Sequence, residues 1–437
     1  MKQRLKSPKH PHRRMWKSSI TFLRRYKFVV FIVLFALIGA GILLAIHAAS
    51  PSVSVEPETG TVNPPAANCN DASASNGACV TFGGIALPMQ GNINRIGQPP
   101  ANYSNVGAYV IEVQWDSLQP VSDADIGSHT GFIDRELAYA KANHLRLKIR
   151  LMAGDCTNMP SDLAPRDPNN PATCAPDPTD VTVNDTSGGS SGGSSVSVHV
   201  AHYWESNVIA AYDNLMQQLA QKYDNKDSGL NEITDSLCMS VYAEPFLTHN
   251  DDPTTVQDYL QAGYTDAKGQ NCIKQSIDIH AKYWHYVRTG IAFNPWGTID
   301  GTPASPITGS NENFTDQMIA YCREPNVLGQ RCVLENNSIR ASTKMTTGSV
   351  YAKIQSMGPP ISLQTAATPR ICGTIAPKPS DHDCLVSTIN FATNCVGSNA
   401  VELPGGFDAY ISDGDLGPLQ TLLMNNPTDL IRSSFSC

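Results

Sequence analysis

Short apolar strands alternate with helical patterns over about 350 residues, from Ile85 to Cys437. Leu145–Met152 reads LRLKIRLM, and its period of two places apolar and basic residues on opposite faces of a strand. Phe132–Asn143 and Ser206–Tyr223 carry apolar residues at helical spacing instead. The remaining strands are predicted at Ile85–Asn92, Ala108–Trp115, Leu237–Leu247, Val287–Asn294, Arg331–Glu335, Ile361–Ala366 and Ala400–Leu403. Eight strands alternating with helices predict an α/β fold, a (β/α)8 TIM barrel.

The predicted fourth strand, Leu237–Leu247, carries a candidate acid. Its apolar residues alternate with small and polar ones, and Pro245 ends the strand because it cannot donate to a ladder. Glu244 therefore lies at the carboxyl end, where parallel α/β folds keep functional side chains. A solvated turn residue is the alternative interpretation of a Glu-Pro pair taken alone.

The N-terminal residues predict a membrane anchor. Met1–Lys27 hold ten Lys or Arg and no Asp or Glu, and Phe28–Ile46 contain no charged residue. Roughly 20 apolar residues span a bilayer as a helix, and the basic flank stays in the cytoplasm. We therefore expect a cytoplasmic tail over 1–27, an uncleaved transmembrane signal-anchor helix over 28–49, and the C-terminal domain outside the cell membrane, at the cell surface. A cleaved signal peptide is the alternative, but Ile46–Ala49 is a poor cleavage site.

All twelve cysteines follow this apolar segment, which predicts an oxidising compartment and up to six disulfides. Close neighbours in sequence are the natural pairs to test: Cys69–Cys79, Cys156–Cys174, Cys322–Cys332 and Cys372–Cys384. Residues 50–84 are rich in Pro, Ala, Asn and Ser, which suits an extracytoplasmic stalk with one small hairpin closed by Cys69 and Cys79. No CxxC or His-rich spacing indicates a metal site, and no cofactor is expected.

The charge balance argues against nucleic acid as a partner. Outside the basic tail, 21 Lys and Arg stand against 39 Asp and Glu. The long connection after the third strand contains the Gly/Ser tract Ser187–Ser195, which has no apolar surface to bury and is expected to be mobile. Such a loop over a barrel mouth is either a substrate lid or a neutral insertion.

Three fragments resemble the retaining glycoside hydrolases of the clan A superfamily. Gln114–Pro120 is similar to the family's Trp-x-x-Leu-x-Pro segment, and Leu145–Gly154 with Met159-Pro160 is similar to its third strand and following loop. Tyr242-Ala243-Glu244-Pro245 is similar to the Asn-Glu-Pro that ends strand four, whose Glu is the general acid/base. The resemblance implies a glycoside hydrolase-like barrel over 85–437, a glycan as substrate or ligand, and Glu244 as the acid.

Two positions depart from the family pattern. Ala243 replaces the Asn that touches the sugar 2-hydroxyl, and Gln364 stands on the seventh strand, where the family has its nucleophile. Gln364 cannot be an anionic nucleophile. Cleaving a glycoside requires a proton donor and a carboxylate near the anomeric carbon. Glu402, which ends the eighth strand, is therefore the candidate catalytic partner of Glu244, and Glu335 is the reserve; either could equally be a structural carboxylate.

Arg150 ends the basic face of the third strand, where it could hold a carboxylate ionised or form an internal ion pair with Glu112. Aromatic side chains near strand ends could stack on sugar rings, although core packing is the alternative for each one. The candidate substrate-binding residues are Trp115, Asp116, Arg150, Trp204, Tyr242, Asn294, Trp296 and Gln364.

Together these observations predict a membrane-anchored, outward-facing glycoside hydrolase-like protein, an O-glycosyl hydrolase acting on a cell-surface or environmental glycan. One alternative is a catalytically inactive barrel that binds carbohydrate, which Ala243 and Gln364 favour. Another is a disulfide-bonded envelope scaffold or adhesin.

Overall fold

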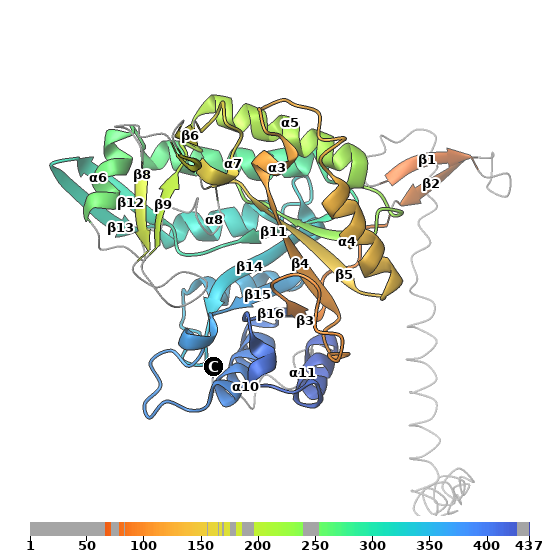
Figure 1. Cartoon of the computed structure of the whole chain (residues 1–437). Helices are drawn as coiled ribbons and strands as arrows, with labels where there is room; N and C mark the ends of the chain where they lie inside the picture. The colour runs from red at the N-terminus through yellow and green to blue at the C-terminus, as the bar shows by residue number, and fades with distance from the viewer. Residues whose placement is uncertain are drawn as a thin grey trace, which may run out of the picture. The chain divides into compact units, whose positions relative to one another are not determined.

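A computed structural model describes residues 66–70, 78–82, 84–154, 156–164, 166–167, 170–174, 181–185, 196–238, 253–425 and 437. Eight parallel strands close into a barrel in chain order, each paired with the next and the last with the first (Figure 1). They are β3 (Gly91–Asn94), β4 (Ala108–Gln114), β5 (Arg146–Met152), β10 (Leu230–Thr234), β11 (Arg288–Ala292), β14 (Cys332–Ile339), β15 (Ile361–Thr365) and β16 (Ala400–Leu403). The predicted (β/α)8 barrel is confirmed.

Helices follow seven of the eight barrel strands. They are α4 (Gly131–Ala142), α5 (Ser206–Tyr223), α7 (Asp266–Tyr283), α8 (Glu312–Cys322), α9 (Val350–Met357), α10 (Asp381–Asn390) and α11 (Asp413–Asn425), with the shorter α3 (Trp115–Leu118) and α6 (Pro253–Gln261) between strands and main helices. Residues 95–107, which join β3 to β4, contain no helix. Gly97, Pro99 and Pro100 disfavour one there. The final helix covers this position instead, and Gln420 on α11 accepts a hydrogen bond from the Asn92 amide of β3 at 2.5 Å.

The predicted fourth strand is wrong. The strand that occupies this place is β10, Leu230–Thr234, and the chain has already left the barrel ladder at Leu237 and Cys238. The sequence favoured the longer alternating segment, whereas the true strand is short and buries a charged residue, Glu232. The Cys238 side chain instead forms a disulfide with Cys272 on α7.

The first barrel strand also differs from its prediction, since it begins at Gly91 rather than near Ile85. The other six strand predictions are each within a few residues of the structure, and Ala400–Leu403 and the helix Ser206–Tyr223 are confirmed to the residue.

In the described residues, β1 (Ala66–Asn70) and β2 (Ala78–Phe82) form a separate two-stranded sheet. Three antiparallel pairs accompany the barrel sheet: β6 (Arg166–Asp167) with β7 (Asn170–Cys174), β8 (Val181–Asp185) with β9 (Val196–Val200), and β12 (Gly297–Thr302) with β13 (Ser305–Ser310). The long connection after β5 therefore contains two hairpins. The Gly/Ser tract Ser187–Ser195 lies outside the described residues.

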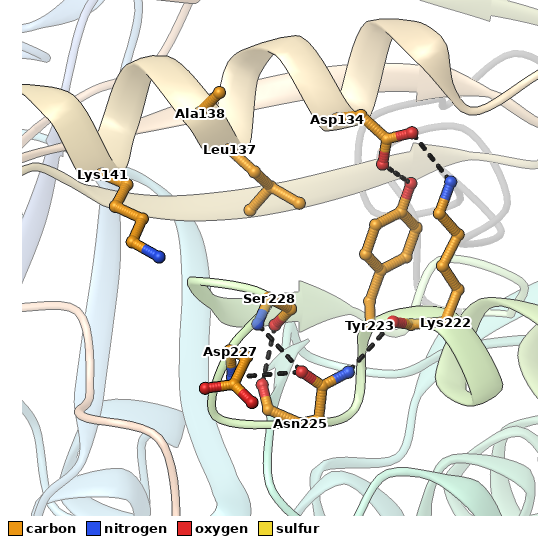
Figure 2. Close-up of a pocket in the computed structure, with 9 residues that line it drawn as sticks. All are labelled: Asp134, Leu137, Ala138, Lys141, Lys222, Tyr223, Asn225, Asp227 and Ser228. Atoms are coloured by element: carbon orange, nitrogen blue, oxygen red, sulfur yellow. Dashed lines mark hydrogen bonds and ion pairs between the residues drawn. The ribbon is translucent and has the colours of Figure 1, made fainter.

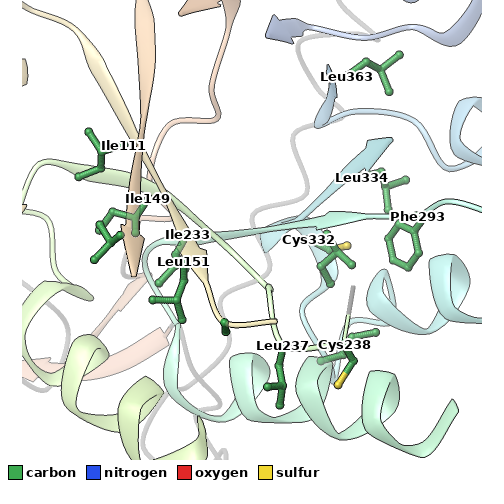
Figure 3. Close-up of a cluster of buried hydrophobic side chains, with 14 of the residues drawn as sticks. Ile111, Ile149, Leu151, Ile233, Leu237, Cys238, Phe293, Cys332, Leu334 and Leu363 are labelled. Carbon is green, nitrogen blue, oxygen red and sulfur yellow. The ribbon is translucent and has the colours of Figure 1, made fainter. Parts of the chain in front are cut away.

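The main apolar core lies between the barrel strands and the helices. Side chains on the outer faces of the strands, among them Ile111, Ile149, Ile233 and Leu334, belong to it (Figure 3). A second, smaller cluster comprises Met89, Ile93, Ala108, Val110 and Ala400. Ile93, Val110 and Ala400 alternate with outer-face residues along their strands, so this second cluster fills part of the barrel interior.

Five disulfides join the described cysteines. Cys156–Cys174, Cys322–Cys332 and Cys372–Cys384 are confirmed. Cys238–Cys272 and Cys395–Cys437, whose partners lie 34 and 42 residues apart, were not anticipated. The predicted pair Cys69–Cys79 falls outside the described side chains.

The predicted membrane helix, 28–49, and the basic tail, 1–27, also lie outside the described residues. Within the part of the chain that is described, no helix is long and apolar enough to cross a membrane.

Candidate active site

Four strands direct buried charged side chains into the barrel. The period of two that places Leu147 and Ile149 of β5 on the outer face turns Lys148 inward, between Arg146 and Arg150. Glu232 of β10, Glu335 of β14 and Glu402 of β16 meet Lys148 there. Barrel interiors are generally filled by branched apolar residues, so this charged layer is a departure from the fold's usual packing.

Lys148 is the centre of the layer. Its Nζ lies 3.2 Å from Glu232 Oε1 and 3.0 Å from Glu402 Oε1, and it also donates to Glu335 Oε1. The Lys148 side chain has no exposed surface. Burial opposes its charge, but the three carboxylates together raise its pKa above the ordinary value. Lys148 is therefore a buried, charged ammonium group.

Arg150 forms both of the contacts that the sequence left open. Its guanidinium donates to Glu402 Oε2 at 2.5 Å and lies 3.4 Å from Glu112 Oε1. Burial alone would raise the pKa of Glu402, but Arg150, Lys148 and Arg95 hold it well below its usual range. Glu402 is thus an ionised carboxylate, 2% exposed.

Arg95 directly follows β3 and is also buried. It donates to the Thr365 side chain at 3.0 Å and to the Thr365 carbonyl, which ties the end of β3 to the end of β15. Thr365 in turn donates to the Glu402 carbonyl at 2.8 Å. Arg95 adds a third positive charge near Glu402.

Glu335 has the opposite electrostatic environment to Glu402. Burial raises its pKa well above the ordinary value, and the neighbouring carboxylates Glu232 and Glu402 raise it further, against the attraction of Lys148. Both Glu335 and Glu402 contact the same ammonium, so their oxygens lie within about 6 Å of one another. Two nearby carboxyl groups with pKa values moved in opposite directions are what a proton donor and an ionised partner require.

The other candidate residues are less closely grouped. Gln364 pairs in register with Glu402 and is half-buried, so the nucleophile position of the resembled family lies one strand from the carboxylate found here. Asn294 follows β11, and its side-chain oxygen accepts from Asn336 at 2.9 Å and from the Asn337 amide at 3.3 Å. Asp116 is half-buried on α3.

The three described tryptophan candidates are buried. Trp115 is 0% exposed and donates from its indole to Gln119 at 2.9 Å. Trp204 packs in a cluster of aromatic rings with Tyr203 and Tyr264. Trp296 packs edge-on against Phe314 and is 5% exposed. For all three, the structure shows the core packing that was the alternative to sugar stacking.

Glu244 and Tyr242 lie outside the described residues, so the proposed acid of the Glu-Pro motif stays a prediction. Sequence reasoning did not select Lys148 and Glu232. Lys148 could have been found, because it lies two residues before Arg150 on the same basic face. Glu232 gave no such signal, since its strand has only five residues.

A second polar cluster lies on the outer side of β10, between the barrel and the helices. Asp235 directly follows β10 and accepts from Ser276 of α7. His280, also on α7, shares a hydrogen bond of 2.9 Å with Tyr212 and one of 3.2 Å with Thr289, and its ring lies 4.0 Å from Asp235. Burial raises the pKa of Asp235 to about 6 and lowers that of His280 to about 3.

One hollow of about 410 Å³ lies away from this site (Figure 2). Its lining comes from α4, the end of α5 and residues 225–228, which precede β10 and so lie toward the amino ends of the strands. Tyr223 donates to Asp134 at 2.7 Å across it, and Lys222 pairs with Asp134 at 2.8 Å. The hollow contains none of the interior charged residues.

No group of three His, Cys, Asp or Glu side chains in the described residues is placed to hold a metal ion. Lys148 occupies the position between the three carboxylates that a cation would otherwise take.

Fold and site together define a (β/α)8 barrel with a buried, charged interior. No family model matches the sequence, and no curated protein matches it. Solved structures with a similar fold include the catalytic domain of a β-amylase from Paenibacillus polymyxa, with 11% identity and a TM-score of 0.43 over 79% of this chain and 100% of that one. The endoglucanase Cel5A of Pseudomonas stutzeri has 11% identity and a TM-score of 0.40, covering 78% and 98%. GH5_18 from Bifidobacterium longum has 13% identity and a TM-score of 0.39, covering 73% and 69%.

Proposed function

We propose that the chain is a glycoside hydrolase-like barrel that cleaves a glycan, with Glu402 as the ionised carboxylate of the reaction. The observation that carries the proposal is the pair of cations on Glu402, Arg150 at 2.5 Å and Lys148 at 3.0 Å. A glycosidase needs one carboxylate that stays charged while positive charge develops on the sugar. Two buried cations keep Glu402 in that state.

The reaction also needs an acid that protonates the leaving oxygen. The sequence predicts Glu244 for this role, and Glu335, whose pKa burial raises, is the other candidate. If Glu244 is the donor, Glu244→Gln should cost at least ~100-fold on substrates with poor leaving groups. The cost should be much smaller on aryl glycosides, which leave without protonation. Glu402→Gln should reduce cleavage of both kinds equally.

The test is an assay of the purified protein on a broad panel of natural and aryl glycosides. Glu136→Gln serves as a control, because Glu136 is a buried glutamate on α4, outside the barrel interior. Cleavage that survives in Glu402→Gln would exclude Glu402 from the reaction.

A carbohydrate-binding barrel without activity is the second candidate, and the burial of the site favours it. Glu402 is 2% exposed and Glu335 6%, and Gln364 holds the place of the resembled family's nucleophile. A lectin-like descendant would bind glycans in the same panel and release no sugar. An envelope scaffold or adhesin would neither bind nor cleave them.

We also propose that residues 28–49 anchor the protein in the membrane and that the domain lies on the outer side. Five disulfides in the described part of the chain support an oxidising compartment. Protease added to intact cells should remove the domain and spare the tail. Recovery of the mature domain from the medium, with its N-terminus near Ala49, would exclude the anchor.

A further inference from the structure

The charged layer holds more carboxylates than cations that reach them. Glu232, Glu335 and Glu402 all contact Lys148, and of these three only Glu402 also contacts Arg150. Glu402 therefore contacts two cations, whereas Glu232 and Glu335 contact only the Lys148 ammonium, which also pairs with Glu402. Burying two unneutralised carboxylates side by side is costly, so one of them is expected to carry a proton.

Of the three carboxylates, Glu232 is the one whose oxygens most lack a hydrogen-bond donor. It has no exposed surface. Apart from the ion pair with Lys148, no described residue donates a hydrogen bond to either of its carboxylate oxygens. A carboxylic acid group on Glu335, which is within hydrogen-bonding reach of Glu232, would supply this donor.

Gly290 provides the space in which the two carboxyl groups meet. It lies on β11, between the strands of Glu232 and Glu335. A Cβ atom at this position would lie 2.5 Å from Glu335 Oε1 and 2.9 Å from Glu232 Oε1. Oxygens of Glu335 and Glu232 thus converge on the space that a side chain at position 290 would fill.

The remaining polar groups around the pair do not replace the proton. Ser362 on β15 is buried and uncharged. Arg95 acts on Glu402. Arg288 on β11 and Arg150 attract Glu232 and Glu335 respectively, but neither contacts the pair, and Arg288 donates to the carbonyls of Ala86 and Gln330. Glu112 is paired with Arg150.

We propose that Glu232 and Glu335 share one proton, and that Glu335 is the acid of the proposed reaction while Glu232 is the positioning residue that keeps it protonated. This rests on the proposed function for its chemical role. As the glycosidic C–O bond breaks, its electron pair stays on the oxygen, which takes the Glu335 proton and departs as the alcohol, while Glu402 stays ionised beside the positive charge on the anomeric carbon. A water molecule then bonds to that carbon through its oxygen and returns a proton to Glu335.

The first test does not depend on activity. Full-length protein labelled with 13C at the glutamate side-chain carboxyls is examined by infrared spectroscopy at about pH 7.5. We expect a carboxylic acid carbonyl band that shifts with the label, which excludes Asp235 as its source. A wild-type spectrum without such a band overturns the shared proton.

Variants then assign the band. Glu335→Gln should abolish it, and Glu232→Gln should shift or weaken it at this pH, because Glu335 loses the adjacent negative charge and gains an amide donor. Glu136→Gln is the matched control, since Glu136 is a buried glutamate on α4, outside the barrel interior. A band that is unchanged in Glu232→Gln, or lost in Glu136→Gln, overturns the assignment. Since the wild-type spectrum decides the main point, a variant that fails to fold leaves the proposal testable.

The kinetic test separates this proposal from the proposed function. Glu335→Gln should cost at least ~100-fold on poor leaving groups and much less on aryl glycosides, with Glu244→Gln sparing both. The alkaline limb of the pH profile, which reports loss of the proton from the acid, should move to lower pH in Glu232→Gln. The reverse pattern, with Glu244→Gln selective for poor leaving groups, overturns Glu335 as the acid. A band without any glycan cleavage supports the shared proton and contradicts the proposed function.

Discussion

Arg150 of β5 donates to Glu402 of β16 at 2.5 Å although two strands, β3 and β4, separate theirs in the barrel. The contact therefore crosses the interior. It links strands that no backbone ladder joins directly, and it does so with a charge pair that is almost completely buried.

Arg150→Met should lower the free energy of unfolding by about 3–5 kcal/mol, because removing one partner leaves Glu402 buried with less neutralisation. The matched control is Lys222→Met, which breaks the exposed pair Lys222–Asp134 and should cost less than about 1 kcal/mol. Urea denaturation at neutral pH measures both. Equal losses in the two variants would contradict a structural role for the interior pair.

Gly290→Ala should destabilise the protein by about 1–3 kcal/mol, because the new Cβ would overlap the carboxyl groups of Glu335 and Glu232. Gly131→Ala is the control. Gly131 begins α4, and an added Cβ there meets no atom within 4 Å. We expect that change to be neutral or slightly stabilising, and thermal unfolding compares the two. If both variants unfold at the wild-type temperature, the carboxyl groups do not meet at Gly290.

Asp235 should make stability fall with rising pH. Its pKa is raised from 3.8 to about 6 by burial, so the folded state binds the proton more tightly than the unfolded state. Its contribution is present below pH ~4 and is lost as the pH rises through ~6, by about 3 kcal/mol in all. Asp235→Asn should remove this loss, as measured by denaturation at several pH values.

His280 should make stability rise with rising pH, opposite to the effect of Asp235. Burial lowers its pKa from 6.5 to about 3, so the unfolded state binds the proton more tightly and stability rises with pH from ~3 to ~6.5. In wild type the two slopes oppose each other between pH ~4 and ~6. Asp235→Asn should therefore expose a rising slope and His280→Gln a falling one. Parallel curves for the two variants would contradict this assignment.

The disulfide Cys395–Cys437 closes a segment of 42 residues, and Cys322–Cys332 one of 10. Replacing both cysteines of a pair by serine should cost about 4 kcal/mol for the longer segment and about 3 kcal/mol for the shorter, if loop entropy in the unfolded chain dominates. Denaturation under non-reducing conditions measures the free energy of unfolding of both variants and shows which loss is larger. A larger loss for the shorter pair would show that native contacts, not chain entropy, set the effect.

The barrel could be predicted from sequence because most of its strands have outer faces with regular apolar alternation, such as Leu147, Ile149 and Leu151. The fourth strand could not, because Leu230–Thr234 is short and has Glu232 on its inner face. A longer alternating segment a few residues downstream fitted the strand pattern better.

The candidate site was predictable only in part. Arg150 and Glu402 were selected from their places at strand ends, and the structure brings them together. Their contact depends on closure of the barrel, which brings strands that are far apart in the sequence around a common interior. No local sequence pattern shows which side chains will meet there. The tryptophans show the converse, since Trp115 and Trp296 lie near strand ends yet pack into the core.

The charged layer also divides unequally along the chain. The first four barrel strands and the residue after β3 supply Arg95, Lys148, Arg150 and Glu232, whereas the last four supply Glu335 and Glu402. A half-barrel from either part would bury charges of one sign in excess. Each half therefore depends on the other to offset its excess charge, and two separately expressed halves should associate with each other rather than with copies of themselves.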